Sequence, residues 1–188
     1  YGIIDVYLGT ERRIEDVELD RPFEECRGIG RSFGINKEEG CENYLSVKEL
    51  LVTLCDLVSK GGNFLLNIGP DGDGTIPPIM EERLLGMGKW LETNGEAIYE
   101  SEVYCNKAPD GVYYTQRDGN IYAITEKFPS KETVFAEIDF DENYKISLLG
   151  SEGTVIAENK DGKLALRTDI CAPEDVACEH LYVYKISK

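Results

Sequence analysis

The sequence has 188 residues, of which 41% are hydrophobic, and 20 basic against 36 acidic residues give a formal net charge of −16. This size and composition predict a packed protein of one large or two small domains and exclude a disordered chain. The acidic excess argues against nucleic-acid or anionic-membrane partners, because both surfaces are themselves negatively charged. No apolar run approaches the roughly 20 residues that a membrane helix needs.

The first 22 residues are irregular and acidic, and they carry neither a start methionine nor a basic leader. We expect a surface loop ahead of Pro22, and a sequence that is part of a longer protein. No two cysteines form a C-x-x-C pair and the sequence has one histidine, so no zinc site is expected. Free, mostly buried thiols are favoured over disulfides, which slightly favours the cytoplasm over secretion. The cysteines are Cys26, Cys41, Cys55, Cys105, Cys171 and Cys178.

Residues 23–36 are rich in glycine and aromatic side chains and have no helical period. This pattern is compatible with a short strand followed by a loop at the mouth of a barrel. Next, Ser46 and Glu49 match a capping box, which predicts the start of a helix. Its apolar residues recur with helical spacing and form one stripe, expected to face the core: Val47, Leu50, Leu51, Leu54 and Val58.

The stretch 60–78 combines a helix end, a strand, a loop and a new helix start. Gly61 and Gly62 are expected to end the first helix. Residues 64–68 are apolar except for Asn67, which is typical of a strand covered on both faces, as in a parallel sheet or barrel. After an Asp-Gly-Asp-Gly turn, Pro77-Pro78 predicts a second helix that Asn94-Gly95 closes. This order indicates an α/β fold, whose active site lies on the loops after the strands.

From residue 101 onward the sequence consists of short runs rich in β-branched and aromatic residues, separated by turn signals. Many short strands in series predict an all-β antiparallel sandwich. We therefore place a domain boundary near residue 100, which gives domains 1–100 and 101–188. The expected strands are 112–115, 121–125, 133–136, 145–149 and 180–185, together with a hairpin of 155–157 and 163–166 around Asp161-Gly162.

Spacing alone offers few residues for chemistry. The pair Glu24-Glu25 lies next to a glycine-rich aromatic loop and is suited to acid/base work, although a solvated loop explains it as well. Asp71 and Asp73 lack the remaining ligands of a calcium loop, so a turn with exposed aspartates is the simpler interpretation. His180 lies in the last strand pattern, where a structural role is expected.

Several longer motifs resemble one known family. The run 57–70, Leu-Val-Ser-Lys-Gly-Gly-Asn-Phe-Leu-Leu-Asn-Ile-Gly-Pro, and the run 73–77, Asp-Gly-Thr-Ile-Pro, are similar to the C-terminal barrel signature of glycoside hydrolase family 29 α-L-fucosidases. Residues 94–99, Asn-Gly-Glu-Ala-Ile-Tyr, continue it, and residues 23–34 resemble the block before it. The strands after residue 101 match only in type, as the family's C-terminal β-sandwich.

The resemblance implies the C-terminal part of a (β/α)8-like barrel followed by an all-β antiparallel sandwich domain. It also implies hydrolysis of terminal α-L-fucosyl linkages with retention, in which one carboxylate attacks the anomeric carbon and another acts as acid/base. The nucleophile and the fucose-binding histidines of the family lie in segments upstream of Tyr1. The implied substrate is a fucosylated glycan or a small fucoside, no metal or organic cofactor is implied, and a homo-oligomer is left open.

The resemblance places the acid/base at Glu24, with Glu25 as the second candidate. Apolar neighbours such as Phe23 and Phe33 would raise the pKa of this carboxyl by desolvation, as an acid catalyst requires. Phe33 and Tyr44 are candidates for an apolar wall against the methyl group of the sugar, and ordinary packing is the other interpretation of both rings. Two alternatives to the enzyme are a non-catalytic fucose- or glycan-binding protein and a structural fragment.

Overall fold

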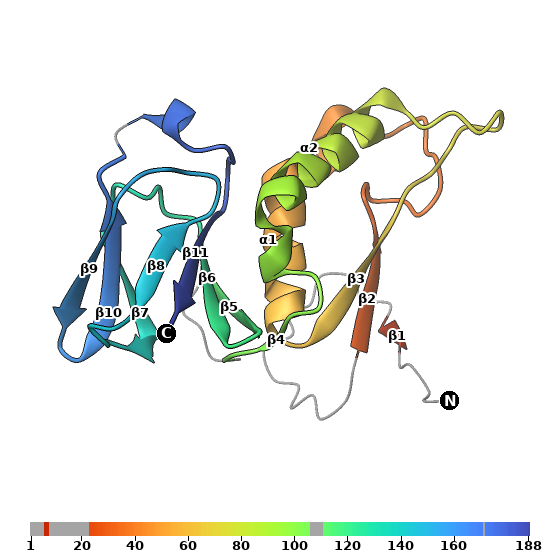
Figure 1. Cartoon of the computed structure of the whole chain (residues 1–188). Coiled ribbons are helices and arrows are strands. Elements are labelled where there is room, and N and C mark those ends of the chain that lie inside the picture. The colour runs from red at the N-terminus through yellow and green to blue at the C-terminus, as the bar shows by residue number, and fades with distance from the viewer. Residues whose placement is uncertain (1–5, 8–22, 106–110, 171) are drawn as a thin grey trace. The chain divides into compact units, whose positions relative to one another are not determined.

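The computed structural model describes residues 6–7, 23–105, 111–170 and 172–188 (Figure 1). The loop expected over residues 1–22 lies outside these residues except at Val6 and Tyr7, which form a short strand, so the prediction is wrong at these two positions. Contacts divide the chain into two compact units, residues 1–88 and 89–188, and the division falls inside one long helix. The domain boundary near residue 100 stays a prediction. Among the described residues, no helix is both long enough and apolar enough to cross a membrane.

The first unit contains a parallel sheet in the order β1-β2-β3 (Figure 1). Its strands are β1 (Val6–Tyr7), β2 (Phe23–Gly28) and β3 (Gly62–Asn67). The register pairs Phe23 with Gly62 and Gly28 with Asn67. The predicted strand and loop after residue 23 and the predicted parallel strand near residue 64 are therefore confirmed.

Helix α1 (Val47–Ser59) connects β2 to β3 and begins as the sequence predicts. Ser46 Oγ accepts a hydrogen bond from the Glu49 amide at 3.2 Å, and Glu49 Oε2 accepts one from the Ser46 amide at 2.8 Å. Its buried side chains only partly follow the predicted stripe: Leu50 and Leu51 are buried, but Leu54 and Val58 are half-buried and Cys55 and Leu57 are buried instead. Gly61 has the predicted left-handed conformation, with φ of 83°.

Gly62 has a different role from the predicted helix end. It is the first residue of β3, and a Cβ built on it would lie 2.5 Å from Cε2 of the Phe23 ring. Glycine is needed here because an aromatic ring occupies the space of a side chain. The prediction that both glycines end the helix is wrong for Gly62.

One face of the sheet is exposed, although the sequence predicts that both faces of strand β3 are buried. Side chains alternate along β3: Phe64 and Leu66 are half-buried, whereas Asn63 and Leu65 are exposed, Leu65 to 50%. Helix α1 packs on β3, and the half-buried side chains indicate that it covers the face of Phe64 and Leu66. The prediction of a strand covered on both faces is wrong for the described chain, since nothing in it covers the Leu65 face.

Helix α2 (Pro78–Asn94) begins at the predicted proline pair. In the first unit it approaches α1 closely, since a Cβ on Gly86 would lie 2.6 Å from Cγ2 of Val47. Arg83 Nε donates to the Leu45 carbonyl at 3.1 Å. The helical spacing of Met80, Leu84, Met87 and Leu91 predicts a core stripe. The prediction is confirmed at Met80 and Met87, which are 2% and 8% exposed, whereas Leu84 and Leu91 are half-buried.

The second unit contains two antiparallel sheets, with strand orders β7-β10-β9 and β4-β5-β6-β11-β8 (Figure 1). The predicted antiparallel sandwich is confirmed. Its strands are β4 (Glu102–Val103), β5 (Val112–Arg117), β6 (Asn120–Thr125), β7 (Thr133–Asp139), β8 (Lys145–Leu148), β9 (Val155–Lys160), β10 (Lys163–Thr168) and β11 (Tyr182–Ser187).

Two tight hairpins form at Asp-Gly turns, one of which is the predicted Asp161-Gly162. Asp118-Gly119 joins β5 to β6 and Asp161-Gly162 joins β9 to β10, and all four residues have positive φ. Paired positive φ values twist the turn in the sense that the flanking strands need. His180 also has a positive φ, 74°, and β11 begins two residues later, so the predicted strand start at residue 180 is wrong.

The C-terminal half of α2 packs within the second unit. Trp90 is 3% exposed and its Nε1 donates to the Leu181 carbonyl at 2.9 Å. In the short turn after the helix, Glu96 Oε2 accepts from Lys185 Nζ at 2.6 Å and from the Tyr122 hydroxyl at 3.0 Å. The helix end is thereby attached to β6 and β11.

The cysteines agree in part with the predicted free thiols. Cys26, Cys41, Cys55 and Cys178 are free thiols, and Cys55 and Cys178 are buried. Cys41 is exposed and Cys26 is half-buried, so burial is less common among them than predicted. Cys171 lies outside the described residues.

Candidate active site

The loops that follow β2 and β3 leave the sheet at the same edge, because parallel strands end on one side (Figure 1). The first loop spans residues 29–45 and the second spans residues 68–77. Three apolar side chains on them are exposed: Phe33 at 50%, Ile35 at 37% and Ile76 at 37%. We call these three the apolar rim.

The two candidate carboxylates lie on opposite faces of the sheet. Glu24 pairs with Asn63 and Glu25 pairs with Phe64. Since successive side chains of a strand alternate between faces, Glu24 shares the uncovered face with Asn63 and Leu65, and Glu25 shares the face that α1 covers. Both residues are half-buried. The geometry therefore separates two candidates that spacing alone could not distinguish.

The position of Glu24 along the strand is a second feature. It is the second residue of β2, four residues before Gly28, and a strand rises about 3.3 Å per residue. Its backbone is thus about 13 Å from the edge where the loops leave the sheet. In barrel enzymes the catalytic residues lie at that carboxyl edge, so Glu24 would have to act from the uncovered face of the sheet, deeper than the loops.

The two candidate substrate-binding residues differ in exposure. Phe33 belongs to the apolar rim and is open to solvent. Tyr44 is half-buried against Gly30, where a built Cβ would lie 3.1 Å from the tyrosine ring. Burial, and then the neighbouring carboxylate of Glu39, raise the pKa of Tyr44 above its ordinary value. One Glu39 oxygen, Oε1, is buried without a hydrogen-bond partner.

Asp71 and Asp73 shape the turn of the second loop. Asp73 Oδ1 accepts a hydrogen bond from the Thr75 amide at 3.0 Å, which lowers the pKa of this carboxyl. The Asp71 amide donates to the Thr75 carbonyl at 2.8 Å, and Gly74 has a φ of 87°. This arrangement supports the interpretation as a turn.

Sequence reasoning missed part of the apolar rim and the residues beneath it. Ile35 and Ile76 were not singled out because isolated surface apolar residues are common. Asn67 is visible as the polar residue of an apolar run, but its hydrogen bond to the Phe33 carbonyl joins residues that are 34 apart in the sequence.

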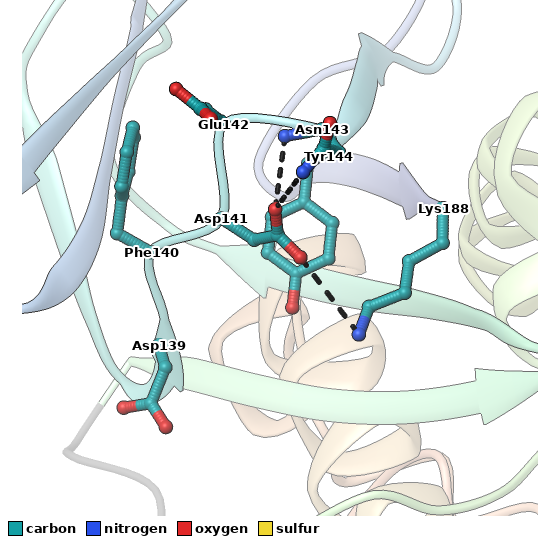
Figure 2. A pocket seen from close by; sticks show the side chains of 7 residues that line it. All are labelled: Asp139, Phe140, Asp141, Glu142, Asn143, Tyr144 and Lys188. Carbon is teal, nitrogen blue, oxygen red and sulfur yellow. Dashed lines mark hydrogen bonds and ion pairs between the residues drawn. The ribbon is translucent and has the colours of Figure 1, made fainter.

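Across the described ranges, no group of three His, Cys, Asp or Glu side chains is placed to hold a metal ion. An open acidic hollow lies at the turn between β7 and β8 (Figure 2). Asp141 there accepts hydrogen bonds from the backbone and side chain of Asn143, and Lys188 approaches its other oxygen at 3.9 Å. These contacts close a turn and point to no ligand.

An aromatic platform on the sandwich would favour the glycan-binding alternative. In the described part of residues 89–188, the large hydrophobic side chains that are exposed are Tyr99 and Val134. Other aromatic rings are inside the sandwich: Tyr114, Phe135 and Tyr184 pack edge to face in its core, with centroids 6.2 and 5.8 Å apart. Of the other exposed large apolar residues, Phe33, Ile35 and Ile76 are on the loops of the parallel sheet, Leu65 is on β3 and Leu85 is on α2.

Comparison with known proteins gives consistent matches. A family model described as Alpha-L-fucosidase matches residues 2–96, just over half of the chain. Tissue alpha-L-fucosidase of Homo sapiens is 34% identical, and the match covers 96% of this chain and 40% of that protein. Plasma alpha-L-fucosidase of Homo sapiens is 43% identical over 62% of this chain and 26% of its own length.

A solved structure agrees with the sequence matches. Thermotoga maritima alpha-fucosidase in complex with fucose superimposes with a TM-score of 0.75 at 35% identity, over 89% of this chain and 40% of that chain. The chain thus spans 40% or less of each of these relatives. It has the fold of the C-terminal part of such an enzyme, late elements of a (β/α)8-like barrel followed by an antiparallel β-sandwich. The family-model match and the shared fold show that this chain belongs to the alpha-L-fucosidase family.

Proposed function

We propose that the protein containing this chain is a retaining α-L-fucosidase that hydrolyses terminal α-L-fucosyl linkages of glycans or small fucosides. The observation that carries the proposal is the 34% identity to the human tissue enzyme over almost the whole chain. The Thermotoga maritima relative of similar fold was solved with fucose. No cofactor is needed for this chemistry, since two carboxyl groups suffice.

The reaction has two steps. A carboxylate forms a bond to the anomeric carbon while the glycosidic C–O bond breaks, and the acid/base residue gives its proton to the leaving oxygen. The same residue then removes a proton from water, whose oxygen displaces the carboxylate and releases fucose. None of the acidic residues of this sequence matches the nucleophile motif, so the proposed site needs residues upstream of Tyr1.

Within this chain we propose Glu24 as the acid/base. Its side chain is half-buried on the uncovered face of the sheet, on a strand that has neighbours on both sides, β1 and β3. Glu25, the second candidate, is on the face that α1 covers, which leaves less room for a substrate. Glu24 lies four residues before the end of β2, so it would reach the sugar from the face of the sheet and not from a loop.

The rim residue Phe33 and the neighbouring Tyr44 are proposed as apolar contacts of the sugar. Phe33 has the exposure that such a contact needs, and a fucose methyl group would gain by leaving water against its ring. Tyr44 has less surface to offer and would act mainly by supporting the loop at Gly30.

The test is an assay with a chromogenic and a natural α-L-fucoside on the purified protein, whose intact mass is measured alongside. Activity at a mass well above the 21.1 kDa of this chain would support a complete site. Glu24→Gln is expected to lower turnover of the natural fucoside at least about a hundredfold. The chromogenic substrate is affected less in its first step, because its leaving group needs less protonation. Azide should restore turnover of the chromogenic substrate by Glu24→Gln, because azide attacks the glycosyl-enzyme intermediate without needing a base.

Glu25→Gln is the matched control and is expected to keep most of the activity. Full activity in Glu24→Gln would overturn the assignment. The search would then move to Glu25 and to the acidic residues within 1–22, which the family model also covers: Asp5, Glu11, Glu15, Asp16, Glu18 and Asp20. Absence of fucosidase activity at the full intact mass would overturn the proposed function itself.

A further inference from the structure

The apolar rim is carried by irregular backbone, yet the contacts beneath it fix two of its three members. Phe33 and Ile35 lie on the first loop, and Ile76 lies on the second. An exposed side chain on a loop gains little order from its own packing, so its placement depends on how the loop backbone is held. The residues that hold it are at the end of β3.

Asn67, the last residue of β3, holds the first loop at two points. Its side-chain Nδ2 donates a hydrogen bond to the Phe33 carbonyl. Its own carbonyl accepts a hydrogen bond from the Ile29 amide at 2.9 Å. One residue therefore ties the beginning of the loop and the residue that carries the rim ring to the same strand end.

Gly69 makes the second connection, by backbone contact between the two loops. A Cβ built on it would lie 2.5 Å from the carbonyl carbon of Gly34, and Gly69 is buried. On its other side, the Gly69 amide points to Met80 Sδ at 3.4 Å, and Met80 is 2% exposed. Any larger residue here would push the segment of Phe33 and Ile35 away from the strand end.

We propose that Asn67 and Gly69 are positioning residues for substrate recognition: they hold Phe33 in place for the methyl-bearing face of the fucosyl unit without touching the sugar. The inference rests on the proposed function. A ring held in its binding position loses less conformational entropy when the sugar binds, so the contact contributes more to affinity. Asn67 and Gly69 thus contribute to the selectivity for a 6-deoxy sugar, although neither residue contacts it.

The first test compares kinetics of the full protein on an α-L-fucoside and on the matching α-L-galactoside, which carries a hydroxymethyl group instead of the methyl. Asn67→Asp removes the amide donor at constant size. We expect KM for the fucoside to rise about tenfold with kcat little changed, as for a lost ground-state contact. The preference for fucoside over galactoside should fall toward that of Phe33→Ala. Asn159→Asp is the matched control and should change neither quantity. Asn159 is exposed on β9, and its Oδ1 accepts a hydrogen bond from the Gly162 amide, which an aspartate can also accept.

The second test is a double-mutant cycle. If Asn67 acts through Phe33, adding Asn67→Asp to Phe33→Ala should change the selectivity little further. Additive effects of the two substitutions, or an unchanged selectivity in Asn67→Asp, would overturn the proposal. Gly69→Ala tests the same idea independently if Asn67→Asp fails to fold, and it should reduce selectivity in the same direction.

A third measurement separates this inference from the proposed function. Hydrogen–deuterium exchange, read by mass spectrometry on peptides that cover residues 29–36, reports the opening of the first loop with no substrate needed. Asn67→Asp and Gly69→Ala should each speed exchange in this loop, whereas Asn159→Asp should not. Unchanged exchange in both variants would overturn the positioning role even in an active enzyme, and an inactive wild-type protein would overturn only the function.

Discussion

The ring of Phe23 occupies the space that a side chain at Gly62 would need, and the two residues are direct partners in the register of β2 and β3. The contact joins the first residues of two parallel strands and buries Phe23 to 9% exposure. It fixes the pairing from which the opposite faces of Glu24 and Glu25 follow.

Gly62→Ala should therefore destabilise the protein, because the added methyl group forces the buried Phe23 ring out of its position. Overpacking of this kind costs about 1–3 kcal/mol. Chemical denaturation followed by far-UV circular dichroism measures the change. Gly72→Ala is the control, since nothing lies within 4 Å of a Cβ at Gly72 and its φ is not positive. Equal stability of the two variants would contradict the packing described here.

Local features of the fold were predictable from the sequence because their causes lie within a few residues. The capping box of Ser46 and Glu49 marks the start of α1, and Asp161-Gly162 marks a hairpin. Each signal depends on side chains and dihedral angles that are specified by the residues themselves.

The sequence was less informative where the cause is distant. Burial of Leu65 was predicted from an apolar run, but exposure depends on which elements cover the sheet. The contact of Asn67 with Phe33 joins residues 34 apart, and no periodic pattern signals it. Glu24 and Glu25 were separated only when the register with β3 was known. The family resemblance named Glu24, and the physical reasoning alone did not.

The capping box of α1 predicts an acid-sensitive contribution to stability. Ser46→Ala removes the acceptor for the Glu49 amide and should cost about 1 kcal/mol at neutral pH. The hydrogen bond from Ser46 lowers the pKa of Glu49 below its ordinary value. A lowered folded-state pKa means that the stabilisation is present above the unfolded value of about 4.3 and is lost as the pH falls through the folded value.

The measurement is the stability difference between wild type and Ser46→Ala from pH 7 down to pH 3. The difference should narrow below about pH 4, where Glu49 becomes protonated. Ser46→Thr keeps the hydroxyl group and should remain close to wild type throughout. A difference that stays constant down to pH 3 would show that the Glu49 carboxylate contributes nothing to the cap.

The ion pair of Lys185 and Glu96 predicts the opposite pH dependence. Lys185 Nζ lies 2.6 Å from Glu96 Oε2, and this hydrogen bond raises the pKa of the lysine. The stabilisation is then complete below the unfolded pKa of about 10.4 and is lost as the pH rises through the folded value. Because both side chains are partly exposed, at 30% and 39%, we expect Lys185→Met to cost only about 0.5–1 kcal/mol at pH 8.

Urea denaturation at pH 8 and at pH 11 checks this sign. The cost of Lys185→Met should be smaller at pH 11, where the wild-type lysine is losing its proton. Lys163→Met is the control, because its ion pair with Asp139 lies at the surface and should contribute less at either pH. A cost that grows with pH would exclude the ion pair as the source of the stabilisation.

Trp90, the single tryptophan of the sequence, allows the packing of α2 in the second unit to be measured directly. The ring is 3% exposed and its Nε1 donates to the Leu181 carbonyl at 2.9 Å. The part of the native fluorescence that is lost in Trp90→Phe should therefore be blue-shifted and shielded from acrylamide, and both properties should disappear on denaturation. A lost component with the emission of water-exposed tryptophan would contradict this packing.

Trp90→Phe should destabilise the second unit by about 1–3 kcal/mol, because the buried Leu181 carbonyl loses its indole donor and the smaller ring leaves a void. Cys178 Sγ, at 3.7 Å from the same carbonyl, is too weak a donor to replace the indole. Circular dichroism follows the unfolding of this variant. Tyr99→Phe, at an exposed ring, is the control and should stay within about 0.5 kcal/mol of wild type. Equal effects at the two positions would mean that the Trp90 contact does not stabilise the attachment of the helix end.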